Sequence, residues 1–302
     1  MATVADPQPA ELPLAGGRRN ATVRVHPLLS GTSIGPPAYF HRAEGRGATL
    51  KALGVRVPRD QWVPVPTVSF VLEHPSAGPV LVDTGLHPSV AIDPRQNLGR
   101  FGKLILKELK TDPAQAVTAQ LRARGLDPVS VRVVVMTHLH LDHASAMSDF
   151  PDATFVFDRR EWAAATAPRS LLRGYVQSQF DHGFDYRTVD FESEHADSFA
   201  SFGRSFDLFG DGSVQLVSTP GHTDGHLSVV ARTSGGEVLI VGDAAYTRRT
   251  LETGHLPART EDEHLFRRSL QEIQLYREQT PDAVIIVGHD MRAWRSLQPV
   301  YG

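Results

Sequence analysis

The chain has 302 residues and a mass of 33.1 kDa, enough for one large domain or two small ones. Hydrophobic residues make up 41% and charged residues 22%, as in ordinary globular proteins, and the formal charge of −3 comes without a run of basic residues, which argues against nucleic acid as a partner. The absence of cysteine excludes disulfides, thiol nucleophiles and metal sites that need a thiolate.

The first segment, residues 1–20, is rich in Ala, Pro and Gly and predicts a flexible tail. Its pair Arg18-Arg19 lacks the continuous apolar stretch that follows in a twin-arginine signal. No other stretch has the apolar length that spans a bilayer, so we expect no membrane partner and a cytoplasmic location. One domain is expected over 21–302, because no linker inside it is long enough to mark a boundary.

The hydrophobic pattern over 21–302 predicts strands interleaved with helices, which indicates an α/β fold. Strands are expected at 22–25, 62–73, 80–85, 131–136, 154–157, 214–217, 227–231, 238–241 and 283–287. Helices are expected at 99–110, 112–125, 159–167, 170–180 and 261–278, with caps at Asp112 and Thr260. Residues 34–58 resemble a long loop with room for one helical turn, and the structure of the aromatic and acidic segment 181–213 stays open.

The most informative motif follows the strand expected at 131–136 and reads His138-x-His140-x-Asp142-His143. Three imidazoles and one carboxylate in so short a stretch point to metal binding rather than to a solvated loop, and imidazole suits zinc, iron, copper or nickel. Since residues i and i+2 of an extended segment project to the same side, His138 and His140 can reach one ion. After the chain turns, Asp142 and His143 can reach a second ion.

Three further apolar strands also end in a metal-capable residue. They deliver His222, Asp243 and His289, each immediately after a glycine. Because strand ends of α/β folds meet in one crevice, we expect these residues to join the motif in a single site. Five His and two carboxylates are enough for two ions, and Asp243, which stands alone at its strand end, is the natural bridge. The alternatives are a turn-capping role for Asp243 and packing roles for His222 and His289.

These motifs resemble those of the metallo-β-lactamase superfamily, hydrolases with a four-layer αββα sandwich of mixed sheets. The resemblance spans roughly 62 to 290 and includes Gly221-His222-Thr223-x-Gly225-His226 and the turn Asp83-Thr84-Gly85. It implies a hydrolase domain over 21–302 that binds two Zn²⁺, for which Fe, Co or Mn can substitute. The implied ligands are His138, His140 and His222 for one ion and Asp142, His143 and His289 for the other, with Asp243 bridging.

The residues around these ligands disfavour two subfamilies. Members that hydrolyse β-lactams commonly use a Cys ligand, which this chain lacks, and diiron redox members typically carry Glu at the place of His140. The stretch Gly242-Asp243-Ala244-Ala245-Tyr246 instead resembles the N-acyl-homoserine lactonases, in which a Tyr at this place faces the substrate carbonyl. The resemblance therefore implies a dinuclear zinc lactonase that quenches quorum sensing, whose partner is a small lactone or ester. The alternative for Tyr246 is an aromatic side chain that merely packs near the site.

The mechanism that we expect is attack of a metal-bridging hydroxide on the lactone carbonyl. Tyr246 would stabilise the oxyanion, and Asp142 would carry the proton to the leaving alkoxide. Asp83 either hydrogen-bonds a ligand imidazole or is only a turn residue, and structural roles are expected for His226 and Asp290. The aromatic residues that either line an acyl pocket or pack in the core are Tyr39, Phe40, Trp62, Phe180 and Phe184.

Several rival functions can use the same site. They are a thioesterase, an aryl esterase, a phosphodiesterase acting on RNA, a mononuclear iron dioxygenase and a non-catalytic binding protein. The negative charge argues against RNA, and the complete set of ligands argues against the binding protein. The long N-terminal segments leave a homodimer open.

Overall fold

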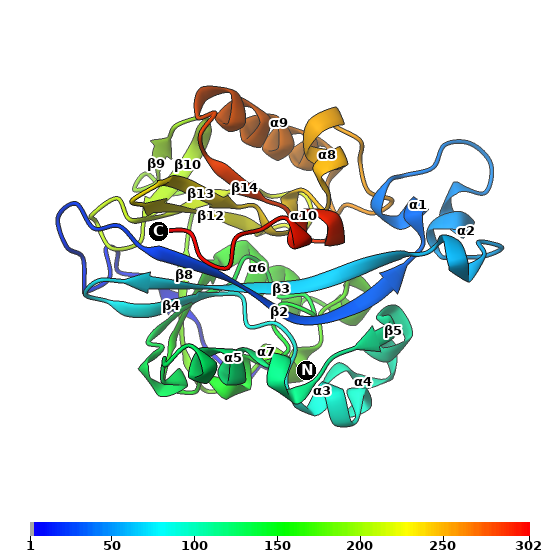
Figure 1. The fold of residues 1–302 in the computed structure, drawn as a ribbon, viewed down its shortest axis with the longest axis horizontal. Coiled ribbons are helices and arrows are strands. Elements are labelled where there is room, and N and C mark those ends of the chain that lie inside the picture. The colour runs from blue at the N-terminus through cyan, green and yellow to red at the C-terminus, as the bar shows by residue number, and fades with distance from the viewer. Residues whose placement is uncertain (1–2) are drawn as a thin grey trace.

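Two β-sheets pack face to face, and helices cover their outer faces (Figure 1). The computed structural model describes residues 3–302. Helices α8 (Arg248–Thr253) and α9 (Glu263–Gln279) lie over the six-stranded sheet at the top of Figure 1. The eight-stranded sheet is covered on its other face by α5 (Val117–Ala123), α6 (Arg159–Thr166) and α7 (Gln177–Phe180), of which α5 and α7 lie below the sheet in Figure 1. This is the αββα sandwich of mixed sheets, so the predicted fold class is confirmed.

The eight-stranded sheet has the order β1-β8-β7-β6-β4-β3-β2-β5. Its strands are β1 (Gln8–Pro9), β2 (Arg24–Gly35), β3 (Val63–His74), β4 (Gly78–Val82), β5 (Lys107–Lys110), β6 (Val133–Val135), β7 (Thr154–Asp158) and β8 (Asp185–Val189). Strands β4, β6, β7, β8 and β1 are parallel, whereas β2 pairs antiparallel with β3 and β5, and β3 with β4. The parallel strands β4 and β6 are rich in Val and buried at their centres, as expected where helices cover one face and a second sheet the other.

The six-stranded sheet has the order β14-β13-β12-β11-β10-β9. Its strands are β9 (Asp197–Phe199), β10 (Phe202–Asp207), β11 (Val214–Ser218), β12 (Leu227–Thr233), β13 (Gly236–Ile240) and β14 (Val284–Ile286). All neighbours are antiparallel except β13 and β14, which are parallel and therefore end at the same edge of the sandwich.

The remaining helices lie at the rim. At the right of Figure 1, α1 (Pro37–Phe40) and α2 (Ala48–Ala52) lie at the end of the long strands β2 and β3. The others are α3 (Ser89–Ile92), α4 (Pro94–Ile105) and α10 (Met291–Arg295), with 3-10 turns at Arg59–Gln61, Pro113–Gln115, Pro128–Ser130, Met147–Asp149, Ser170–Arg173 and Gly242–Ala244. None of the helices within the described residues combines the length and the hydropathy that a bilayer span needs.

Alternating side chains of the strands build three layers of core. On β4, Val80 and Val82 face the other sheet, whereas Leu81 packs with the outer helices. On β12, Val229 reaches the same inter-sheet core and Val230 lies in the cluster under α9. Each fully buried aliphatic side chain stabilises the fold by about 1.5–3 kcal/mol. A shift of one residue in register would exchange the side chains of the two faces between the inter-sheet core and the layer under the helices, so the packing of both layers fixes where each strand ends.

Some predicted helices differ from those observed. The helix expected at 99–110 ends at Ile105, and Lys107–Lys110 instead forms β5 by pairing with β2. The capping box of Asp112 is present, but it closes a 3-10 turn and α5 begins only at Val117. Helix α9 is capped by Asp262, whose side chain accepts from the Leu265 amide, and not by Thr260. These ends depend on tertiary contacts that local propensity does not contain.

The N-terminal segment packs against the sandwich, in contrast to the tail expected over 1–20. Gln8–Pro9 pair with β8 as β1, and the Leu14 amide donates to the Leu208 carbonyl. Leu12 and Leu14 pack against the inter-sheet core. Backbone pairing and apolar contact together hold this segment on the surface of the fold.

Candidate metal centre

The loops that follow β6, β11, β13 and β14 meet at one end of the sandwich. The loop after β6 comes from the eight-stranded sheet, and the other three come from the six-stranded sheet. All seven residues that the sequence predicts as ligands lie here. They form three overlapping groups whose donor atoms lie within 4.8 Å of one another, namely His138, His140 and His222; His138, His143 and Asp243; and Asp142, His143 and His289.

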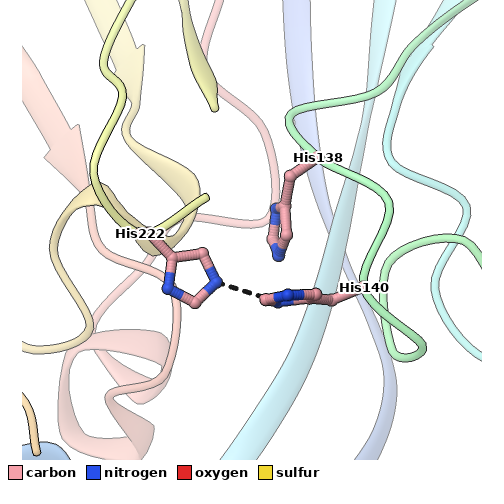
Figure 2. A group of neighbouring side chains, drawn as sticks. All are labelled: His138, His140 and His222. Carbon is pink, nitrogen blue, oxygen red and sulfur yellow. Dashed lines mark hydrogen bonds between the residues drawn. The ribbon is translucent and has the colours of Figure 1, made fainter. Parts of the chain in front are cut away.

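His138, His140 and His222 turn their rings toward a common point (Figure 2). His222 Nε2 lies 3.0 Å from His140 Nδ1. The ring centroids of the three imidazoles are 4.7–4.8 Å apart and the planes are nearly perpendicular in each pair. Rings that meet edge to face with nitrogen atoms inward are arranged to donate three lone pairs to one cation.

Asp142, His143 and His289 form the second group. Asp142 Oδ2 lies 3.7 Å from His289 Nε2 and 3.9 Å from His143 Nε2. The Asp142 side chain is 16% exposed, whereas that of His143 is 2% exposed. The carboxylate of Asp142 therefore reaches both the group and the outside of the site.

Asp243 lies between the two groups, and its oxygen atoms contact both of them, with Oδ2 also 3.2 Å from His289 Nε2. Oδ2 lies 3.2 Å from His222 Nε2 and 3.8 Å from His138 Nε2. Oδ1 lies 3.2 Å from His289 Nε2 and 3.6 Å from His143 Nε2. The β13 and β14 loops can approach so closely because residue 288 is glycine, where a Cβ would lie 2.7 Å from Asp243 Oδ1. A carboxylate in this position can be shared by two metal ions.

The donor atoms of this site fit divalent metal ions. In the described part of the chain, His138 Nε2, His143 Nε2 and Asp243 Oδ1 are buried and have no hydrogen-bond partner. Buried polar atoms without a partner cost free energy, and coordination to a cation would satisfy them. Imidazole and carboxylate donors in the absence of thiolate suit zinc, and also iron, cobalt or manganese.

Burial keeps the first three imidazoles neutral. It lowers the pKa of His138 and His222 well below the usual value and that of His140 to about 4. At pH 7 these rings therefore carry a free lone pair, which is the form that binds metal.

The imidazoles of the second group have the opposite shift. Burial alone would lower the pKa of His289, but the carboxylates of Asp243 and Asp142 outweigh it and raise the pKa to about 9. Burial likewise opposes charge on His143, and there Asp83 and the same carboxylates raise the pKa. A metal ion that binds here must replace the proton of at least one imidazole.

Asp83 orients one of these imidazoles, so the hydrogen-bonding alternative for this residue is the one observed. Its Oδ2 accepts from His143 Nδ1 at 2.7 Å, and its Oδ1 accepts from the Thr137 amide at 2.8 Å. The residue has a φ of 60°, a left-handed conformation that turns the chain at the end of β4. Similarly, His289 Nδ1 donates to the Pro66 carbonyl at 3.0 Å. Both contacts leave Nε2 directed into the site.

Tyr246 lies beside the first group. Its hydroxyl is 3.2 Å from His222 Nδ1, and its ring is 5.4 Å from that of His222 and 5.3 Å from that of His289, measured between centroids. Tyr39 and Phe40 of α1 pack against its ring. Burial raises the pKa of the Tyr246 hydroxyl, which therefore keeps its proton at neutral pH.

The other residues singled out in the sequence lie outside the two groups. His226 Nε2 accepts from the Asp243 amide at 3.0 Å, and Asp290 caps α10 by accepting from the Arg292 amide. Phe180 and Phe184 pack in the layer between the eight-stranded sheet and its helices, so neither lines the site.

Two buried residues beside the ligands carry no signal in the sequence. Glu161 lies in the first turn of α6, where an acidic residue is common, and it is fully buried. Tyr175 has its ring 4.8 Å from that of His140. Their positions follow from how α6 and the segment before α7 pack under the loops, which no local pattern encodes.

Known proteins share these features. The pattern of the Metallo-beta-lactamase superfamily matches residues 62–289. The N-acyl homoserine lactonase AttM of Agrobacterium fabrum is 33% identical, over 91% of this chain and 96% of its own length. The protein of the same name from Azorhizobium caulinodans is 34% identical, over 93% of this chain and 98% of its own length.

Solved structures with the same fold include three that hold a bound ligand. A mutant of AiiA from B. thuringiensis with N-decanoyl-L-homoserine at its active site has a TM-score of 0.72 at 23% identity, covering 92% of this chain and 97% of that one. An N-acyl homoserine lactone hydrolase with N-hexanoyl-L-homoserine at its catalytic metal center has a TM-score of 0.72 at 22% identity, with the same coverage. AidC, a dizinc quorum-quenching lactonase in complex with a product, has a TM-score of 0.58 at 13% identity, covering 91% of this chain and 89% of that one.

Proposed function

The chain belongs to the metallo-β-lactamase superfamily, and we propose that within it the protein is a metal-dependent lactonase that opens the ring of N-acyl-homoserine lactones and so quenches quorum sensing. The observation that carries this proposal is the position of the Tyr246 hydroxyl, next to His222 at the edge of the metal centre. A protonated phenol there is placed to donate to the carbonyl oxygen of a bound ester. The names of the relatives that match along nearly the whole chain support a lactone as that ester.

Two zinc ions are the proposed cofactors, and that number is supported by the two groups of donor atoms that share no residue, one around His140 and one around Asp142. His138, His140 and His222 would hold one ion, Asp142, His143 and His289 the other, with Asp243 shared. When bound, such ions polarise a carbonyl group and lower the pKa of water so that it can act as a nucleophile at neutral pH.

Tyr246 would stabilise the negative charge that develops on the carbonyl oxygen. When His222 Nε2 faces the centre, its Nδ1–H donates to the Tyr246 oxygen, and the phenolic O–H stays free for the substrate. The donor is held in place before the reaction, so it costs no reorganisation when charge appears.

Asp142 would move the proton. Hydrolysis adds water across the C–O bond of the ring, which breaks to give an alcohol and a carboxylic acid, and the acid then ionises and releases its proton to the solvent. The partly exposed carboxylate of Asp142 can accept the proton that the water loses and pass it to the ring oxygen as that bond breaks. The residues of the site therefore supply a hydrogen-bond donor and a proton carrier without a Ser or Cys nucleophile.

The direct test is a pH-stat assay of acid release with the zinc-loaded protein. N-hexanoyl-homoserine lactone is compared with an acyclic ester and a thioester of the same acyl chain. The lactone is expected to be the preferred substrate, and the activity should be lost in His222→Ala but kept in His264→Ala, a matched change of an exposed histidine on α9.

Other outcomes would identify a different enzyme. Turnover of the thioester with no action on lactones would replace the lactonase by a thioesterase. Metal analysis is expected to find two zinc ions per chain, whereas one iron per chain would favour the dioxygenase. The cytoplasmic location and the homodimer stay predictions, for which gel filtration and fractionation of the native host are the measurements.

A further inference from the structure

Glu161 is a buried carboxylate that the proposed reaction does not use. It lies in the first turn of α6, and its relative exposure is 0%. Among the described residues it forms no salt bridge. Burial raises the pKa of Glu161 to about 7, which shows how unfavourable this environment is for the charge. A buried carboxylate loses its hydration, and hydrogen bonds within the protein must compensate for that loss of free energy.

The two oxygen atoms of Glu161 each hold one of the loops that carry ligands. Oε1 accepts from the amide of Leu139 at 2.8 Å, and this residue lies between His138 and His140. Oε2 accepts from the amide of Gly225 at 3.3 Å, three residues after His222. These amides lie beyond the ends of β6 and β11, where neighbouring strands no longer offer acceptors.

The surroundings of Glu161 show that the second loop is packed directly onto α6. A Cβ on residue 225 would lie 2.1 Å from the Glu161 amide nitrogen, so only glycine allows this approach. On the side of the first loop, the Tyr175 ring lies against His140, and the Glu161 charge contributes to the raised pKa of the Tyr175 hydroxyl. Glu161 thus lies under the point where the loops from the two sheets meet.

We propose that Glu161 is a positioning residue for the metal centre, whose one carboxylate ties the His138–His140 loop to the His222 loop. The two loops come from different sheets, and the imidazoles of Figure 2 converge only when both loops are held at a fixed separation. A carboxylate can do this because it accepts two amide hydrogen bonds at once. The inference rests on the proposed binding of metal at this centre.

The test uses Glu161→Gln, which keeps the shape of the side chain but replaces one acceptor by an NH₂ group that cannot accept from an amide. Zinc affinity is measured by competition with a chelating dye, and the visible spectrum of the Co²⁺-loaded protein reports the geometry of the ligands. We expect affinity to fall by about 10–100-fold, the usual range when groups that orient ligands are removed, together with a changed Co²⁺ spectrum.

Asp158→Asn is the matched control. Asp158 is a second buried carboxylate at the start of α6, but it accepts from the amide and guanidinium of Arg160 and not from a ligand loop. This variant should lower the melting temperature while leaving zinc affinity and the Co²⁺ spectrum of the wild type.

The outcomes separate this inference from the proposed function. A wild-type protein that binds no metal would refute the proposed function itself. A wild type that binds zinc together with a Glu161→Gln protein of equal affinity and native spectrum would overturn the role of Glu161 alone. If the Glu161→Gln variant does not fold, amide hydrogen exchange of the metal-free wild type tests the role of Glu161 instead. The Leu139 and Gly225 amides should exchange at least ~10-fold more slowly than in an unstructured peptide, and unprotected exchange at both would overturn the inference.

Discussion

Tyr246 and His222 form a hydrogen-bonded pair in which the imidazole of His222 positions the phenol of Tyr246 as a hydrogen-bond donor. The contact of 3.2 Å between the Tyr246 hydroxyl and His222 Nδ1 fixes the position of the hydroxyl oxygen, and the ring is held from the other side by Tyr39 and Phe40. Because burial raises the pKa of the hydroxyl, the proton is present over the whole neutral range. A donor so held would act on a carbonyl oxygen more strongly as charge develops there.

Replacing Tyr246 by Phe removes this donor and leaves the ring. We expect kcat for the lactone to fall by about 10²–10³-fold, with little change in zinc content, as for the loss of one donor to a developing oxyanion. Steady-state kinetics and metal analysis measure both quantities. Tyr276→Phe is the control, because this buried tyrosine donates to Glu237 on the far side of the six-stranded sheet. Unchanged kcat in Tyr246→Phe would exclude this hydroxyl from the reaction.

The pKa of His289 predicts a pH dependence of metal binding. Its value of about 9 in the metal-free protein lies above the usual 6.5, so the ring is protonated at pH 7 and a metal ion must displace that proton. Apparent zinc affinity should therefore rise as the pH is raised from 7 to about 9. Calorimetry at pH 7 in two buffers with different ionisation enthalpies should show release of at least one proton per chain. Binding without proton release would contradict the raised pKa.

The seven candidate ligands could be predicted because four of them, His138, His222, Asp243 and His289, come shortly after apolar strands, and the other three share the short motif that begins at His138. Glu161 could not be predicted in this way, since an acid in the first turn of a helix is an ordinary feature of solvent-exposed helices. The same holds for Tyr175, whose neighbours are distant in the sequence. Local sequence patterns do not predict which distant segments of the chain pack against the loops that carry the ligands.

Helix α1 has a structural role that the sequence alone does not indicate. It lies in the segment 34–58, which the sequence describes as a long loop with one helical turn, and it follows directly from β2. Its residues Tyr39 and Phe40 pack on Tyr246, with the ring of Tyr39 stacked at an angle of 12° and that of Phe40 edge-on. The rim segment thus forms the support of the proposed hydrogen-bond donor.

Tyr39→Ala should weaken this support. Aromatic pairs are worth about 0.5–1.5 kcal/mol, so we expect up to roughly a 10-fold loss in kcat, while Tyr39→Phe keeps most of the activity. Steady-state kinetics on the lactone measure the effect. Leu53→Ala, at a position 70% exposed next to α2, is the control for changes in the same segment. Equal activity of Tyr39→Ala and the wild type would show that α1 does not support Tyr246.

The strands that the sequence prediction missed share a physical cause. Residues 107–110 have the composition of a helix end but pair with β2, and Gln8–Pro9 have no pattern of a strand but pair with β8. In both cases an existing strand edge supplies the hydrogen bonds, and this gain outweighs local propensity. Edge strands of this kind are difficult to predict because their partner decides them.

The candidate metal ligands come from both sheets of the sandwich. His138, His140, Asp142 and His143 follow a strand of one sheet, and His222, Asp243 and His289 follow strands of the other. A bound ion would therefore join the two sheets at the end where their loops meet. Metal binding and the stability of the complete fold should be linked.

Removal of metal should accordingly lower the melting temperature. For a ligand at 100 times its Kd the stabilisation is about 2.7 kcal/mol per site, which corresponds to roughly 5 °C for a chain of this size. Differential scanning calorimetry of the zinc-loaded and the chelator-treated protein measures the difference, and readdition of zinc should restore the higher value. Identical melting temperatures with zinc demonstrably bound would show that the ions do not join the sheets.

The two-residue strand β1 has a consequence for the behaviour of truncated chains. It occupies the open side of β8, whose backbone groups would otherwise be available to a strand of another molecule. Its second residue is Pro9, which has no amide hydrogen, so the new border of the sheet is a poor template for extension. Deleting residues 1–20 would expose the five-residue strand β8 along its length. Such a chain would keep its metal ligands and yet be prone to aggregate through edge-to-edge pairing.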